Sequence, residues 1–134
     1  MTVTVEPGLV LDALNAWLKP HGVWFPVDVS TSAQCTLGGM AGNNSCGSRS
    51  IAYGNMVHNV LAIDALLADG TEATFGNGAA MHGAPPRVQT LVERLRAIGE
   101  RERDEIAAKV PRVLRRVGGY NLDVFHPRSE RPYT

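Results

Sequence analysis

The chain has 134 residues, which is the usual size of one domain and enough to bury a hydrophobic core. Hydrophobic residues make up 44% and charged residues 19%, and the 13 basic side chains balance the 13 acidic ones; this excludes disorder and any general electrostatic attraction to nucleic acid or membranes. Two cysteines form neither a redox motif nor a disulfide framework, and the sequence shows neither a signal peptide nor a membrane span, so we expect a reducing, cytoplasmic compartment.

The first segment combines a short extended pattern with a helical one. Residues 3–5 alternate apolar and polar side chains before Pro7, which predicts a strand that ends in a turn. Apolar residues then recur at helical spacing and stop at Pro20, so we expect an amphipathic helix over residues 9–19. Trp17 belongs to the apolar stripe and is expected in the core.

A long segment of small and polar residues follows this helix. Residues 23–25 predict a second brief strand, with Trp24 in the core. From Pro26 to about Tyr53 the abundance of glycine, serine and asparagine predicts a loop.

The middle of the chain carries a hairpin signal. Residues 60–68 are almost wholly apolar, Asp69-Gly70 follows, and residues 71–75 resume an extended pattern. Asp-Gly favours a tight turn because both positions can take positive φ, so we predict a central strand paired with a more exposed one. Asp64 is expected to meet a backbone donor or to lie on the exposed face. Residues 76–86 predict a flexible connection.

Two helical stripes occupy the last third of the chain. Apolar residues recur at helical spacing over residues 88–98 and again over residues 106–117. Gly99 and Pro111 interrupt a single long helix, so we expect two helices or a kinked pair. Residues 120–134 predict a closing loop.

One loop has the composition of an anion-binding segment. Residues 36–47 read TLGGMAGNNSCG, with four glycines interleaved with asparagine and serine. Glycine lets the backbone approach a ligand closely and lets successive N–H groups converge on an anion, while asparagine and serine add hydrogen-bonding groups. The spacing matches neither the dinucleotide fingerprint nor a nucleotide-triphosphate loop, and a plain surface loop is the alternative that composition leaves open.

Ordered blocks on both sides of this loop extend the pattern along nearly the whole chain. They read FPVD, CTLGGMAGNNSCG, YG, NVLAI, LADG and GYNLD, at residues 25–28, 35–47, 53–54, 59–63, 67–70 and 119–123. This succession resembles the FAD-linked oxidases of the vanillyl-alcohol-oxidase type, which contain a PCMH-type FAD-binding domain. The resemblance is greatest to the D-lactate and D-2-hydroxyglutarate dehydrogenase branch.

The resemblance implies the fold and the cofactor. It implies a noncovalently held FAD in an α+β domain of two subdomains, of which this chain supplies the second, with a mixed or antiparallel sheet flanked by helices. Residues 1–80 would form part of the FAD-binding domain, and residues 81–134 would form a helical connection toward a cap domain.

The resemblance also implies the cofactor contacts. In the family, the stretch that matches Asp28 and residues 36–47 runs along the pyrophosphate, the ribityl chain and the flavin, and Ile63 would make a backbone contact near the adenine. The expected cofactor-binding residues are Asp28, Thr36, Gly38, Gly39, Gly42, Asn43, Ser45, Gly47 and Ile63. No catalytic residue and no metal ligand is expected within this chain.

The blocks that this chain lacks define the expected function. The family's first subdomain would precede Val3, and the cap domain with its substrate-binding histidine motif would follow Thr134. We therefore expect a fragment, inactive alone, of an enzyme that oxidises a D-2-hydroxy acid to a 2-oxo acid and passes electrons to a separate acceptor. A homo-oligomer or a completing chain could restore the site. The alternative is a noncatalytic interaction module that binds no flavin.

Several single residues have two interpretations. His58 or Cys46 could attach flavin covalently, although a structural role is favoured for each, and a metal site at Cys35 and Cys46 would lack further ligands. Arg49 would either neutralise a phosphate or remain an exposed cation. Tyr53 would stack near the flavin or pack in the core, with the core favoured.

Overall fold

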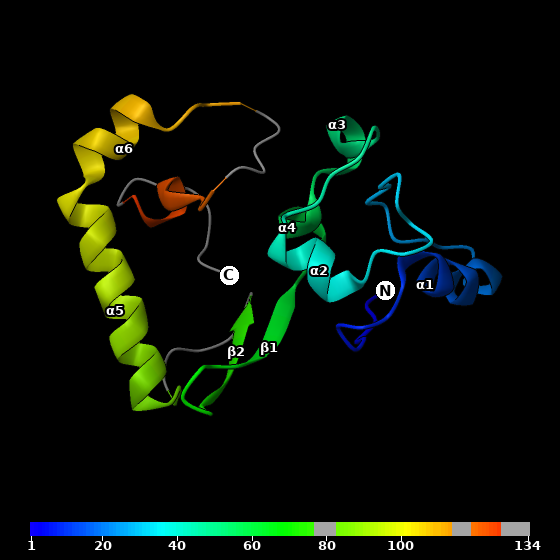
Figure 1. Ribbon diagram of the computed structural model, residues 1–134, viewed down its shortest axis with the longest axis horizontal. Coiled ribbons are helices and arrows are strands. Elements are labelled where there is room, and N and C mark those ends of the chain that lie inside the picture. Colours follow the sequence, from blue (N-terminus) through cyan, green and yellow to red (C-terminus); the bar gives the residue numbers. More distant parts are fainter. Residues whose placement is uncertain (77–82, 114–118, 127–134) are drawn as a thin grey trace. The chain divides into compact units, whose positions relative to one another are not determined.

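The computed structural model describes residues 1–76, 83–113 and 119–126 (Figure 1). The described chain forms two compact units, of which the first spans Met1–Val60 and the second begins at Leu61. Helices dominate, and the described residues contain one small antiparallel sheet of two strands, which gives an α+β fold.

The first helix of the N-terminal unit confirms the sequence prediction. Helix α1 spans Leu11–Leu18 and continues into the short 3-10 helix η1 at Lys19–His21. It ends at Gly22, whose φ of 71° suits a residue without a side chain. Three residues at helical spacing point into the core, namely Leu11, Leu14 and Leu18.

The two short strands predicted beside this helix are wrong. Residues 3–5 and 23–25 form no strand; in this region Val10 and Thr36 make one isolated antiparallel bridge. A strand needs a neighbouring strand to satisfy its backbone groups, and the first unit supplies none to these residues within the described chain.

Three short helices lie in or just after the segment predicted as a loop. They are α2 at Leu37–Gly42, α3 at Ser50–Tyr53 and α4 at Met56–Asn59. Leu37 and Met40 are buried one helical turn apart, which holds α2 in place despite its glycines. The loop prediction failed there because composition alone does not reveal which apolar side chains find a core.

The core of the first unit gathers side chains from α1, α2, α4 and the intervening segment. Its buried members are Leu11, Leu14, Leu18, Val27, Leu37, Met40 and Met56. Trp17 and Trp24 are 59% and 40% exposed, so their predicted core positions are wrong. Trp17 lies off the stripe that α1 buries, and its ring lies beside His21 with the centroids 5.3 Å apart.

The second unit contains the predicted hairpin. Strand β1, at Ala62–Leu66, pairs with β2, at Glu72–Gly76, so that Asp64 faces Thr74. Of the two turn residues only Gly70 has positive φ, at 84°. The prediction that β1 is a central strand is wrong within the described residues, because β1 has one partner strand and is largely exposed.

Two helices follow the hairpin, as predicted, but the first continues through Gly99, where an interruption was expected, and the break falls at Glu102. Helix α5 spans Pro86–Arg101 and α6 spans Arg103–Lys109. Helix α6 ends just before Pro111, which disfavours a helical conformation in the residue that precedes it, whereas the predicted stripe runs on to residue 117. The 3-10 helix η2, at Leu122–Phe125, contacts α5 and α6. Residues 77–82, 114–118 and 127–134, which include parts of the predicted connection, second stripe and closing loop, lie outside the described residues.

Candidate functional site

The predicted cofactor residues fall on both units. Thr36 is the N-cap of α2, Asn43 is its C-cap, and Gly38, Gly39 and Gly42 lie within it. Ser45 and Gly47 follow α2, and Asp28 lies in the segment that enters the core at Val27. All of these residues belong to the first unit, whereas Ile63 lies on β1 in the second.

The glycines of α2 have different surroundings. A Cβ atom added at Gly38 would lie 2.6 Å from the Pro7 Cβ, so this glycine permits close packing against the N-terminal segment. A Cβ added at Gly42 would meet no atom within 4 Å. Internal packing therefore explains Gly38, whereas Gly42 is exposed and faces open space.

Several backbone N–H groups of the glycine-rich stretch are engaged within the chain. The Gly38 amide donates to the Pro7 carbonyl at 2.8 Å, and the Gly39 amide donates to the Thr36 hydroxyl at 3.4 Å. The Gly47 amide donates to the Ser50 hydroxyl at 2.9 Å. These bonds order the stretch and leave Gly42 and Asn43 on its exposed side.

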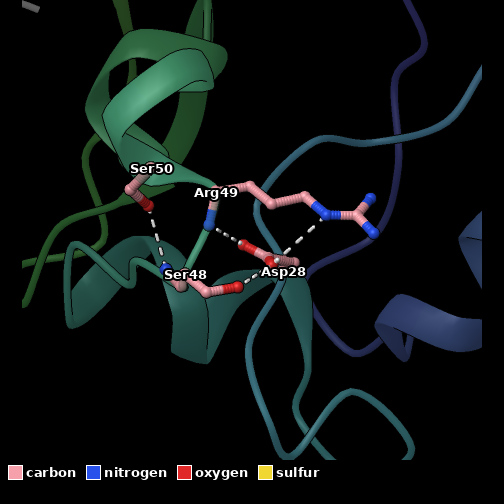
Figure 2. Close-up of polar contacts among 5 residues, drawn as sticks. Asp28, Ser48, Arg49 and Ser50 are labelled. Carbon is pink, nitrogen blue, oxygen red and sulfur yellow. Dashed lines mark hydrogen bonds and ion pairs between the residues drawn. The ribbon is translucent and has the colours of Figure 1, made fainter.

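Asp28 lies at the centre of a polar cluster that joins two distant segments (Figure 2). Its carboxylate accepts a hydrogen bond of 2.8 Å from the Ser48 hydroxyl and one of 3.1 Å from the Arg49 backbone amide. The Arg49 Nε atom lies 3.8 Å from the same carboxylate. Sequence reasoning missed Ser48, because no local pattern links residues twenty positions apart.

Arg49 and two aromatic rings form a second contact between these segments. The guanidinium carbon of Arg49 lies 5.3 Å from the Trp24 ring centroid, within the range of a cation–π interaction. Tyr53 meets Trp24 edge to face at 5.3 Å and is 49% exposed, so its predicted core position is wrong. The short helix α3 carries Tyr53 to the unit's surface, where Trp24 is its ring partner.

Of the remaining candidate residues, His58, Cys35 and Asp64 have contacts within the chain. The His58 Nδ1 atom accepts the Asn55 amide at 3.0 Å and so caps α4. Cys35 and Cys46 are free thiols, and the Cys35 thiol donates to the Met40 sulfur at 3.5 Å. Asp64 is exposed, as expected, and accepts a hydrogen bond from the Thr74 hydroxyl at 2.6 Å.

Among the described helices, none combines the length and apolarity needed to cross a membrane.

We expect the contribution of Asp28 to stability to depend on pH. Burial raises the pKa of this carboxyl, but hydrogen bonds from Ser48 and the Arg49 amide, with the Arg49 charge, bring the pKa below its ordinary 3.8. The unfolded state therefore binds the proton more tightly, so the stabilisation is complete above pH 3.8 and is lost as pH falls through the lower folded pKa. Urea unfolding of the wild type and Asp28→Asn should show a gap that is constant near neutrality and shrinks in acid. A gap that widened on acidification would contradict the assignment.

Comparison with known proteins identifies the family. Residues 1–76, more than half of the chain, match the model of the FAD binding domain. The chain therefore belongs to this family, and its cofactor is FAD.

Relatives of known description agree with this assignment. The D-2-hydroxyglutarate dehydrogenase of Pseudomonas putida is 34% identical over 96% of this chain and 13% of its own length. The probable mitochondrial D-lactate dehydrogenase of Danio rerio is 46% identical over 52% of this chain and 14% of its own length. Glycolate oxidase subunit GlcD of Escherichia coli is 33% identical over 56% of this chain and 15% of its own length. The chain thus spans about a seventh of these relatives, and no solved structure matches it significantly.

Two features of the glycine-rich stretch are compatible with a cofactor lying against it. The open space beside Gly42 would admit a cofactor against the backbone, and the adjacent Asn43 side chain is exposed for hydrogen bonding. The hydrogen bonds of Gly38, Gly39 and Gly47 hold this part of the chain in one conformation. The stretch therefore offers an ordered backbone with one exposed side, against which a cofactor could lie.

Proposed function

We propose that this chain is the FAD-binding portion of a flavin-dependent oxidoreductase that oxidises a D-2-hydroxy acid to a 2-oxo acid. The observation that carries the proposal is the family match across residues 1–76, which contains the open position at Gly42. The relatives described as D-2-hydroxyglutarate and D-lactate dehydrogenases support the substrate class.

Within that enzyme, the chain's own residues would bind and orient the cofactor. FAD, when bound, supplies the hydride acceptor of the reaction. The proposed contacts are Thr36, Gly38, Gly39, Gly42, Asn43, Ser45, Gly47 and Ile63, with Asp28 acting through its neighbours. Among the described carboxyl groups, Asp28 and Asp69 have a pKa that their hydrogen bonds and neighbouring arginines lower.

The organisation of the complete enzyme follows from the same proposal. Residues 1–80 would form part of the FAD-binding domain, as its second subdomain, and residues 81–134 would lead toward a cap domain. Turnover would require further segments, supplied by the same polypeptide, a second copy or a completing chain. The two free cysteines support a reducing compartment, and we propose the cytoplasm.

Replacing Gly42 by alanine tests the cofactor site directly. We expect FAD to bind about tenfold more weakly, because the new methyl group would occupy the space that we assign to the cofactor. Stability should not fall, since alanine favours a helix over glycine by about 1 kcal/mol. Titration of FAD with quenching of flavin fluorescence measures the affinity, and urea unfolding measures the stability.

Gly8→Ala provides the matched control for this substitution. Its new Cβ would also meet no atom within 4 Å, but Gly8 lies outside the proposed contacts. Equal FAD affinity in wild type, Gly8→Ala and Gly42→Ala would contradict the placement of the cofactor. Failure of the wild type to quench flavin fluorescence would contradict binding by this chain and support the noncatalytic module.

A further inference from the structure

We propose that Asp28 is a positioning residue, which fixes residues 47–49 and holds Arg49 against Trp24 without touching the cofactor. Its consequence for FAD affinity rests on the function proposed above. Two segments about twenty residues apart meet here, and the Asp28 carboxylate supplies the polar contacts at one end of their junction (Figure 2).

The segment that carries Asp28 is anchored on the core of the first unit. Val27, the preceding residue, is fully buried. The Phe25 amide donates to the Asn15 side-chain oxygen at 2.8 Å, which ties the same segment to α1. The backbone at Asp28 is therefore held in place, so the carboxylate can fix the position of the groups that donate hydrogen bonds to it.

The partner segment has its hydrogen-bonding groups directed toward this carboxylate. The Ser48 hydroxyl and the Arg49 amide donate to it, and Gly47 passes so close that an added Cβ would lie 1.7 Å from the Asp28 carbonyl oxygen. Ser50 accepts the Gly47 amide and closes the turn. The end of the glycine-rich stretch is thus placed by Asp28 rather than by its own flexible sequence.

A cation–π contact adjoins this polar cluster. Arg49 pairs with Asp28 at 3.8 Å and lies over Trp24, which meets Tyr53 edge to face. Loss of the carboxylate would release the Arg49 amide and side chain together and uncover Trp24.

Charge also argues against a direct contact between Asp28 and FAD. The diphosphate of FAD is anionic, and a carboxylate beside it would repel it. The hydrogen bonds that Asp28 receives favour its ionised form, and they direct the carboxylate toward Ser48 and Arg49. A role through the loop satisfies both observations.

The experiment compares four substitutions in a Trp17→Phe background, where Trp24 is the sole tryptophan. Asp28→Ala removes every contact of the carboxylate, and Ser48→Ala removes one. Asp28→Asn keeps an acceptor for the Arg49 amide but loses the charge. Asp104→Ala removes a carboxylate that is 95% exposed on α6 and serves as the control. Acrylamide quenching reports the exposure of Trp24, and FAD titration reports cofactor affinity.

For Asp28→Ala we expect stronger acrylamide quenching of Trp24 and about tenfold weaker FAD binding, because hydrogen bonds to a charged group are lost. Asp28→Asn should keep Trp24 quenching and FAD affinity close to those of the parent. Ser48→Ala should lie between Asp28→Asn and Asp28→Ala in both measurements, and Asp104→Ala should match the parent. If Asp28→Ala fails to fold, Asp28→Asn and Ser48→Ala decide the question by their graded effects.

The two readouts separate this proposal from the proposed function. Unchanged Trp24 quenching in both Asp28→Ala and Ser48→Ala would overturn the positioning role. A shift in quenching with unchanged FAD affinity in a parent that binds FAD would also overturn it, since the loop would then be irrelevant to the cofactor. A parent that binds no FAD overturns the proposed function. The quenching series then tests only whether Asp28 holds Arg49 against Trp24.

Discussion

Gly47→Ala is expected to weaken FAD binding about a hundredfold and to lower the free energy of unfolding by about 3 kcal/mol. The new Cβ would lie 1.7 Å from the Asp28 carbonyl oxygen and 2.3 Å from a carboxylate oxygen of the same residue. Neither segment can give way easily, because Val27 is fully buried and Ser50 holds the Gly47 amide. Urea unfolding and FAD titration measure the two effects.

Comparison with Gly42→Ala shows which effect arises from packing. Both substitutions add one methyl group to the glycine-rich stretch, but the space at Gly42 is open. We expect Gly42→Ala to lose affinity with stability retained, and Gly47→Ala to lose both. A Gly47→Ala protein as stable as the wild type would show that the two segments are not in contact as described.

Elements with a complete local signal could be predicted from the sequence. Helix α1 has an apolar stripe and is followed by Pro20 and Gly22, and its predicted span agrees with Leu11–Leu18. The hairpin combined two extended runs with a turn dipeptide and formed as expected. In each case the residues that determine the element lie within it or beside it.

Burial could not be predicted where it depends on distant partners. The apolar run at β1 indicates a strand but not how many neighbours it has, and in the described chain it has one. Tyr53 and Trp24 are aromatic, but their ring contacts hold them on a surface rather than in the core. Short helices such as α2 depend on burial of Leu37 and Met40, which composition does not reveal.

The sequence indicates a candidate cofactor-binding stretch but not how its residues are arranged. Resemblance pointed to Asp28 and to residues 36–47, and the family match contains both. The contacts of Asp28 with Ser48 and Arg49 span about twenty residues, and no spacing rule connects them. The different surroundings of Gly38 and Gly42 likewise emerge only when the N-terminal segment is placed beside α2.

Gly99→Ala should destabilise the second unit by about 3 kcal/mol, although helix propensity alone predicts stabilisation of about 1 kcal/mol. Gly99 is buried near the end of α5, and an added Cβ would lie 2.0 Å from the Phe125 carbonyl oxygen and 2.8 Å from the Phe125 Cβ. Two effects of opposite sign compete, and the close backbone contact is the larger. Thermal unfolding followed by far-ultraviolet circular dichroism measures the balance.

Ala97→Gly on the same helix isolates the propensity effect, because Ala97 is exposed. We expect this control to lose about 1 kcal/mol, the cost of glycine within a helix. Gly99→Ala should lose more than the control, even though it makes the reverse change. If Gly99→Ala instead gained stability, η2 would not pack against α5 at this point. The sign of a single substitution therefore tests whether residues 122–125 belong to the folded second unit.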